Sequence, residues 1–292
     1  MTLGDEGPRL RYVALDLDGT TLNDRKFIDK ETVELLRALS QEGVVIILAS
    51  GRMTPSVLIH EKALEIDCHL VTYNGGYCSL QRSLGRPLVF HRPLPTSVSD
   101  SLIDWAKQTN TCVNLYIDDV LYGETNEAHV WQQDKYSRLA QVSYVFVPDI
   151  TAFKGRSSTK VLLLFDKEDE HVVQQGRLTL ERHLEAGPRV NLVNAEFFVE
   201  VLDNDVQKGH GLAGLMRSIN DDMSLVVAFG DGQNDVEFLS TCAVFWLFGG
   251  HSNHYIVLAW VWQCATPTSG PRRPRRTSRP TATMRMSSRG SC

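Results

Sequence analysis

The sequence contains little cysteine, and its cysteines follow no pairing pattern. There are six in 292 residues and none forms a CxxC pair, whereas zinc sites and disulfide frameworks need close, regular spacing. We therefore expect reduced thiols, as in a cytoplasmic protein. Residues 1–12 are polar and charged, so no secretory signal is predicted.

A long uninterrupted apolar run is also missing. The most apolar stretch, residues 243–262, is divided by GGHSNH, whereas a membrane-spanning helix needs about 20 consecutive apolar residues. The interruption disfavours a membrane span without excluding it, and we expect no membrane partner.

Negative charge is absent from the C-terminal part. All 35 acidic residues lie at or before Glu237, and seven arginines lie between Arg272 and Arg289. The formal charge of −5 therefore divides into +7 for the tail and −12 for the rest. An acidic body disfavours nucleic-acid binding through the folded part. The length and the 42% hydrophobic content suit one large or two modest domains.

Short apolar runs alternate with helical patterns near both ends of this body. Strands are predicted over residues 12–17, 44–49 and 69–73, and helices over residues 29–41 and from Pro55 onward. The run 44–49, VVIILA, shows no alternation, as expected of a strand covered on both faces. The fold class predicted is α/β with a parallel sheet.

The middle of the chain differs from this pattern. After the proline-rich GRPLVFHRPLP, we expect helices over residues 97–108 and 168–184 and strands over residues 111–117, 142–147 and 161–165. Such a mixture fits an inserted α+β cap domain. The strand–helix–strand pattern of the first part resumes with FFVEVL, KGHGLAGLMRSI and SLVVAFGDGQND. The predicted division is 1–84 core, 85–189 cap, 190–242 core and 243–292 a partly disordered C-terminal segment.

Polar residues gather where the predicted core strands end. Asp16 and Asp18 end the first strand, residues 50–52 (SGR) end the second, and residues 231–235 (DGQND) follow the last. Lys208 opens the helix before that last strand. Because the carboxyl ends of parallel strands share one edge of the sheet, these groups should converge there.

These residue types suit a phosphate monoester as substrate. Asp16 could attack phosphorus and form an acyl phosphate, and Mg²⁺ would let neighbouring carboxylates approach one another. Residues i and i+2 of an extended segment point to the same side, so Asp18 could protonate the leaving oxygen and later activate water. Ser50 and the Gly51 amide could hold phosphoryl oxygens, and Lys208 could neutralise their charge.

Taken singly, each motif has an ordinary explanation. DxDxT could be a capped turn, SGR a common turn sequence, Lys208 a solvated lysine, and GDGQND a tight loop or a poor imitation of a calcium loop. The joint arrangement, with each motif at an edge of one sheet, favours a phosphate site.

The motifs DLDGT, SGR, KGHGL and GDGQND, in this order, resemble the haloacid dehalogenase (HAD) superfamily, most closely the Cof-type sugar-phosphatase-like hydrolases with a C2-type cap. The resemblance covers about residues 12–242. It implies a Rossmann-like core with an inserted α+β cap, with Asp16 as nucleophile and Asp18 as acid/base. It also implies magnesium held by the Asp16 carboxylate, the Asp18 backbone carbonyl and Asp231. Asp235 is expected to bind these ligands or to contact the metal through water.

The resemblance also implies a set of further residues around the phosphate. The loop NGG, which begins at Asn74, matches a family loop near the cap junction. Lys208 is expected to be catalytic. The residues expected to bind phosphate are Thr20, Ser50, Gly51, Arg52, Asn74 and Asn234.

The expected function is therefore a Mg²⁺-dependent phosphatase that hydrolyses a small phosphorylated metabolite, a sugar phosphate, through an aspartyl-phosphate intermediate. Transfer of the phosphoryl group to a second sugar remains an open alternative. Specificity should depend on cap residues, for which residues 116–124 and 156–160 are the candidates.

The resemblance stops after Cys242. The family's Asn-Asp-Glu-Asp, read one base late, can encode the Thr-Met-Arg-Met of residues 283–286. We therefore hypothesise that the C-terminus is translated out of frame, which makes a catalytically impaired product of a frameshifted or mis-spliced gene the alternative function. An arginine-rich tail that binds RNA or an anionic membrane is the rival explanation.

Overall fold

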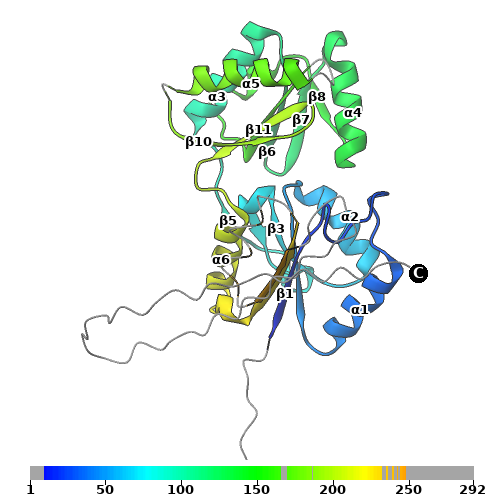
Figure 1. The fold of residues 1–292 in the computed structure, drawn as a ribbon. Coiled ribbons are helices and arrows are strands. Elements are labelled where there is room, and N and C mark those ends of the chain that lie inside the picture. The colour runs from blue at the N-terminus through cyan, green and yellow to red at the C-terminus, as the bar shows by residue number, and fades with distance from the viewer. Residues whose placement is uncertain are drawn as a thin grey trace, which may run out of the picture. The chain divides into compact units, whose positions relative to one another are not determined.

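The computed structural model describes residues 10–165, 170–185, 187–231, 235, 239, 242 and 244–247. These residues form two β-sheets with helices (Figure 1). The seven-stranded sheet has the order β13 (Val244–Leu247), β12 (Val226–Gly230), β1 (Tyr12–Asp16), β2 (Val45–Ala49), β3 (His69–Thr72), β4 (Tyr77–Ser79) and β5 (Leu88–His91). The six-stranded sheet has the order β10 (Val190–Asn194), β11 (Phe198–Asp203), β9 (Lys160–Leu164), β6 (Cys112–Ile117), β7 (Val120–Glu124) and β8 (Val145–Val147).

Six α-helices are found in the described part of the chain. They are α1 (Lys30–Gln41), α2 (Thr54–Leu64), α3 (Thr96–Thr109), α4 (Val130–Ala140), α5 (Glu170–Leu184) and α6 (Lys208–Ser218). The seven-stranded sheet with α1, α2 and α6 is called the core below. The six-stranded sheet with α3, α4 and α5 is called the cap.

The core sheet is covered on both faces, with α1 and α2 on one side and α6 on the other (Figure 1). Along β2, Ile46 and Leu48 pack in the cluster that contains α1 and α2, whereas Ile47 and Ala49 pack in the cluster that contains α6. The apolar run without alternation arises because each face meets a helix layer. The predicted α/β class is confirmed. The core sheet is parallel from β13 to β3, as predicted, whereas β4 and β5 pair antiparallel.

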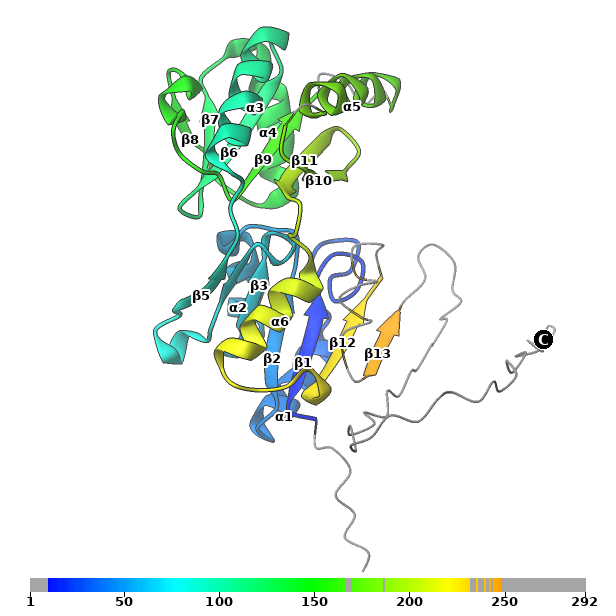
Figure 2. The ribbon, with the colours of Figure 1, turned by 90° about the vertical axis from the view of Figure 1, so that its left-hand side faces the viewer.

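The register of the core strands places the predicted site residues at one edge. β1 pairs in parallel with β2, opposing Asp16 to Ala49, and with β12, opposing Leu15 to Phe229. β1, β12 and β13 run side by side in Figure 2. The residues that follow these strands therefore meet at the carboxyl edge of the sheet.

The two faces of the cap sheet have different partners. One face packs against α3 and α5, with Leu102 and Leu180 fully buried. The other face forms a cluster in which Tyr136 of α4 joins Met53 and Tyr73 of the core. This second face of the cap sheet lines the candidate site.

The predicted cap boundaries at 85 and 189 both need correction. β5 pairs with β4 in the core sheet, and β10 and β11 belong to the cap sheet, so the chain returns to the core only after Asp203. FFVEVL was assigned to the core because it opens a strand–helix–strand pattern like that of the first part, and such a pattern does not identify a strand's partner. The sequence also missed β7 and α4, and of the strand predicted over residues 142–147 only residues 145–147 are strand.

Two expectations about the chain concern its C-terminal segment and its cysteines. Residues 244–247 form β13, and the remainder of the segment 243–292 lies outside the described residues. Cys68, Cys78, Cys112 and Cys242 are buried free thiols.

No helix in the described part of the chain has both the length and the apolar character required to cross a membrane.

Candidate active site

The turn after β1 holds Asp16 at the edge of the core sheet. The Thr21 hydroxyl donates a hydrogen bond of 2.5 Å to the Asp16 carbonyl. Gly19 has φ +88°, and a Cβ atom at this position would lie 2.0 Å from Asp231 Oδ2. Both the left-handed backbone and the close approach of Asp231 therefore require glycine here.

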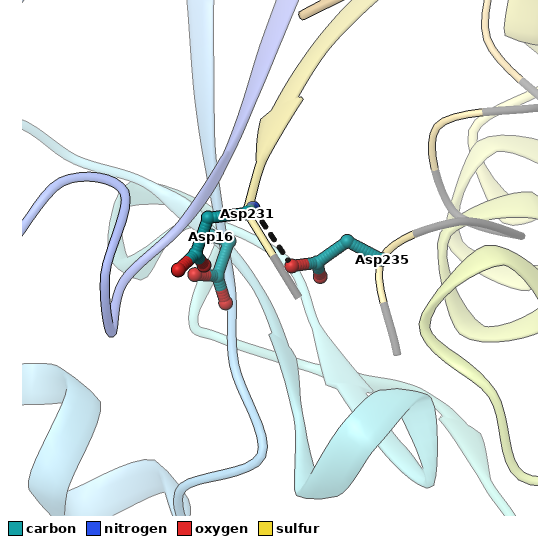
Figure 3. A group of neighbouring side chains, drawn as sticks. All are labelled: Asp16, Asp231 and Asp235. Carbon is teal, nitrogen blue, oxygen red and sulfur yellow. Dashed lines mark hydrogen bonds between the residues drawn. The ribbon is translucent and has the colours of Figure 1, made fainter. Parts of the chain in front are cut away.

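Three carboxylates meet beside this turn (Figure 3). Asp16, Asp231 and Asp235 each have a carboxylate oxygen within 4.8 Å of those of the other two. Asp16 and Asp235 are buried, and the backbone N–H of Asp231 donates to Asp235 Oδ2 at 3.2 Å. The Thr20 hydroxyl donates to Asp231 Oδ1 at 3.2 Å. The predicted convergence of Asp16 with Asp231 and Asp235 is therefore present in the structure.

Lys208 lies among these acids, at the first residue of α6. Its side chain is 1% exposed, and Nζ donates to Asp16 Oδ1 and, at 2.7 Å, to Asp235 Oδ1. The NGG loop positions this end of α6, because a Cβ at Gly75, whose φ is +92°, would lie 2.2 Å from the carbonyl oxygen of Gln207. Lys208 is thus not the solvated lysine of the ordinary explanation.

This group has more acidic side chains than basic ones. Burial raises the pKa of Asp16 to about 7, with Lys208 opposing the rise and Asp235 adding to it. Burial also raises the pKa of Asp231. Burial lowers the pKa of Lys208, but Asp16 and Asp235 more than compensate, so its pKa is raised and it stays charged. One ammonium group therefore faces three carboxylates.

A divalent cation fits this arrangement. Asp16 Oδ2 is buried and accepts no hydrogen bond from any described residue. A hard cation with oxygen ligands, such as Mg²⁺, would use this oxygen and offset the excess negative charge. The carboxylates of Asp16, Asp231 and Asp235 are the side chains that could hold it.

The Asp18 carboxylate lies outside this group and binds two cations of the protein. Arg52 donates from Nε at 2.7 Å and from Nη2 at 2.8 Å, and Lys26 donates from Nζ at 2.8 Å. Burial raises the pKa of Asp18, but the hydrogen bonds and charges of Arg52 and Lys26 outweigh it and hold the pKa well below its usual range. The side chain is therefore ionised, and Arg52 binds Asp18 rather than standing free for a phosphate.

The SGR segment and Asn74 form a second wall of the site. Ser50 is 1% exposed, its hydroxyl accepts from the Arg52 backbone N–H at 3.2 Å, and its carbonyl accepts from the Asn74 N–H at 3.0 Å. A Cβ at Gly51 would lie 2.9 Å from Asn74 Oδ1. The end of β2 and the loop after β3 are thus tied together.

These groups line one cavity of about 450 Å³, a volume typical of small-molecule sites. Thr20 is not among its lining residues and binds Asp231 instead. Asn234 lies outside the described residues. The predicted site residues that line the cavity are Asp16, Asp18, Ser50, Gly51, Arg52, Asn74, Lys208, Asp231 and Asp235.

Three charged cavity residues are absent from the predicted catalytic, phosphate-binding and metal residues. Lys26 comes from the loop after β1 and contacts Asp18. Lys160 and Glu200 come from the cap and form a buried ion pair of 2.8 Å. Lys160 closes a segment, residues 156–160, that was proposed for specificity, whereas Glu200 was assigned to the core. The one feature of the sequence that marks Glu200 is that it is a single acid within the apolar run FFVEVL.

A further cap residue, Asp119, also contacts the core. It accepts a hydrogen bond of 2.8 Å from the Tyr73 hydroxyl and one of 3.3 Å from the Thr54 backbone N–H. Burial raises its pKa, although these two hydrogen bonds oppose the rise. Asp119 lies within residues 116–124, the other segment proposed for specificity, and its contacts join the cap to the first turn of α2.

Comparison with known proteins identifies the family. Residues 13–245 match the model of the haloacid dehalogenase-like hydrolases. The chain belongs to this family. Among HAD relatives, a Haemophilus influenzae protein named "Putative phosphatase" is 31% identical over 233 residues, covering 79% of this chain and 82% of the relative.

Two further HAD relatives share most of their length with the chain. The 5-amino-6-(5-phospho-D-ribitylamino)uracil phosphatase YitU of Bacillus subtilis is 26% identical, covering 78% of this chain and 82% of its own. The crystal structure of TM0651 from Thermotoga maritima superposes with a TM-score of 0.71 at 26% identity, covering 81% of this chain and 85% of its own. These matches support a phosphoric monoester hydrolase, and they give no support to the alternative of an impaired product.

Proposed function

We propose that this HAD hydrolase cleaves a small phosphorylated metabolite, a sugar phosphate, through an aspartyl-phosphate intermediate on Asp16, with Mg²⁺ as cofactor. The observation that carries the proposal is the buried group of Asp16, Asp231 and Asp235 around Lys208. The relative that acts on a phosphorylated ribityl compound supports a phosphorylated sugar or polyol as substrate.

The first half of the reaction forms the bond between an Asp16 oxygen and phosphorus and breaks the bond from phosphorus to the leaving oxygen. Lys208 holds Asp16 Oδ1 and thereby fixes the orientation of the nucleophile. When bound by Asp16, Asp231 and Asp235, Mg²⁺ would neutralise charge on the phosphoryl oxygens and on these acids. In the second half, water attacks phosphorus and releases Asp16.

Asp18 is the proposed acid and base, and its present partners indicate how it would gain a proton. Arg52 and Lys26 keep its carboxyl ionised. A phosphate dianion in the cavity would compete for both cations, since each lines the cavity. Losing them raises the pKa of Asp18, so that it can donate a proton to the leaving oxygen and later take one from water.

The backbone of the SGR segment and Asn74 are proposed to hold the phosphoryl oxygens. Ser50, Gly51 and Asn74 line the cavity and are fixed relative to one another by the hydrogen bond from Asn74 to the Ser50 carbonyl. Thr20 would act indirectly by orienting Asp231.

Hydrolysis of 4-nitrophenyl phosphate with and without Mg²⁺ tests the proposal. We expect turnover only with the metal, and a loss of about a thousandfold or more in Asp16→Asn, because the nucleophile is removed. Acid quenching of a reaction with labelled substrate should trap a phosphoprotein. Turnover by Asp16→Asn at the rate of the parent protein would refute the proposed mechanism.

A further inference from the structure

Two backbone segments at the phosphate end of the cavity, the part that the core residues Asp16, Gly51 and Asn74 line, do not fix their own conformation. Gly51 has no side chain, so few conformations of its backbone are excluded. In the loop after β3, Tyr73 and Asn74 both have φ +54°. Asparagine tolerates this left-handed backbone, whereas tyrosine rarely adopts it and remains there only when its surroundings fix it. Phosphate binding therefore depends on the groups that hold these two segments.

The peptide units on either side of Gly51 are held by different groups. In the unit before it, the Ser50 carbonyl accepts from the Asn74 backbone N–H at 3.0 Å. Because the N–H and the carbonyl of a trans peptide point in opposite directions, this bond sets the direction of the Gly51 N–H. In the unit after it, the Gly51 carbonyl accepts from Lys160 Nζ at 3.1 Å. Lys160 is the first residue of β9, so the cap fixes this second unit directly.

The cap also fixes the loop that carries Asn74. The Tyr73 hydroxyl donates to Asp119 Oδ1 at 2.8 Å, and Asn74 Nδ2 donates to Glu200 Oε2 at 3.3 Å. Asp119 lies in the turn between β6 and β7, and Glu200 lies in β11. These contacts stabilise the left-handed backbone of the loop, and Asn74 in turn holds the Ser50 carbonyl. The cap therefore supports both peptide units, one directly and one through Asn74.

A buried ion pair of the cap joins these two supports. Lys160 Nζ donates to Glu200 Oε1 at 2.8 Å, and the two side chains are 1% and 11% exposed. The Glu200 carboxylate thus accepts from Lys160 with one oxygen and from Asn74 with the other. Since the two charges of the pair cancel, it adds no net charge to the phosphate end. What the pair supplies to that end is the position of its partners.

We propose that Lys160 and Glu200 are positioning residues for the phosphate, because they hold the Gly51 peptide and the Asn74 amide in the geometry that receives the phosphoryl oxygens. This inference rests on the proposed function and adds to it two residues that act through the phosphate-binding groups. Their partners bind the part common to every phosphate ester. Losing the pair should therefore weaken binding of all esters equally, and of inorganic phosphate, which has no leaving group, by the same factor.

The test uses Lys160→Met combined with Glu200→Gln, which leaves the net charge unchanged. Calorimetry in the presence of Mg²⁺ gives the dissociation constant of inorganic phosphate, and steady-state assays give KM and kcat for 4-nitrophenyl phosphate and ribose 5-phosphate. We expect the dissociation constant and both KM values to rise about tenfold, as the loss of hydrogen bonds to charged groups implies. The kcat should change by less than about threefold, because the phosphoryl oxygens are bound in both the ground state and the transition state.

The matched control is Lys154→Met combined with Asp104→Asn, which removes an exposed ion pair of the cap and should leave all these constants at the parent values. Glu200→Asp is a second variant, to be used if circular dichroism shows that the double variant is unfolded. It keeps the counter-ion of Lys160 but is one methylene too short to hold Lys160 and Asn74 together. It should raise the same constants by about threefold.

An unchanged affinity for inorganic phosphate in the folded variant would overturn the inference. A loss confined to the esters would also overturn it, because the pair would then contact the leaving group. A parent protein that binds inorganic phosphate but hydrolyses neither ester would overturn the proposed function, and the phosphate constants would still decide the inference. A parent protein that hydrolyses the esters but shows the same constants as the variant would overturn the inference alone.

Discussion

Replacing Glu200 with glutamine should destabilise the protein strongly, because the substitution leaves Lys160 buried without its counter-ion. The Lys160 side chain is 1% exposed. Its remaining partners would be neutral groups, namely the amide at position 200, the Gly51 carbonyl at 3.1 Å and the rings of Tyr73 and Tyr116. Breaking a buried ion pair by removing one partner costs about 3–5 kcal/mol. With an m-value of about 3 kcal/mol per M, the urea midpoint should fall by about 1–1.7 M.

The loss of stability should also depend on pH. Burial lowers the pKa of Lys160, and in the parent protein Glu200 more than offsets this, so that the pKa is raised. Without Glu200 the pKa should fall below that of the unfolded chain, where lysine titrates near 10.4. The unfolded state then binds more protons, so the variant should recover stability as the pH rises toward 10.

Tryptophan fluorescence during urea unfolding measures the effect, because Trp105 and Trp131 both lie in the cap. Asp104→Asn is the matched control, since it removes an acid from the exposed pair with Lys154 and should cost about 1 kcal/mol or less. Lys160→Met combined with Glu200→Gln should recover much of the loss, because no buried charge remains. The reasoning would be refuted if the free energy of unfolding of Glu200→Gln lay within about 1 kcal/mol of that of the parent protein. It would also be refuted if the double variant were less stable than Glu200→Gln.

Three further predictions address the turn after β1, the acid/base and a buried histidine. Gly19→Ala should weaken Mg²⁺-dependent turnover about tenfold or more while the circular dichroism spectrum is retained, because its Cβ would displace Asp231 from a distance of 2.0 Å; unchanged Mg²⁺ dependence would contradict this. Arg52→Ala should raise the pKa of Asp18 and, because Asp18 must be protonated to donate to the leaving oxygen, move the basic limb of the kcat/KM profile to higher pH, and an unmoved limb would show that Asp18 does not control it. Burial lowers the pKa of His69 to about 4, below the ordinary 6.5, so this side chain should remove up to about 1.4 kcal/mol of stability per pH unit as the pH falls from 6.5 to 4. An NMR titration of His69 with a midpoint near 6.5 would contradict that prediction.

The location of the site was predictable because it depends on a general property of parallel sheets. Asp16, Ser50 and Asp231 are far apart in the sequence, but each ends or directly follows a strand of the same sheet. The parallel pairing of β1 with β2 and β12 brings them together. The orientation of Asp18 was not predictable in the same way. Alternation along a strand shows the side to which a side chain points. The contacts of Asp18 depend instead on Arg52, which follows β2, and on Lys26, which lies eight residues further along the same loop.

The cap was less predictable, because its role depends on pairing between distant strands. β11 has the composition of a buried core strand, yet it pairs with β9 and β10. Only this pairing places Glu200 beside Lys160, and together they contact Gly51 and Asn74 at the phosphate end of the cavity.

The same pairing explains why specificity cannot be inferred from a motif. The apolar wall of the cavity takes Leu139 from α4, Val142 from the segment after it, and Val193 and Phe198 from the β10 and β11 hairpin. None of these side chains carries chemistry, so no sequence pattern distinguishes them from ordinary core residues. The phosphate end is built from side chains whose type fits the reaction, whereas the wall is built from shape and lack of polarity. Substitutions in the wall should therefore change which ester is hydrolysed, and substitutions at the phosphate end should change whether any ester is hydrolysed.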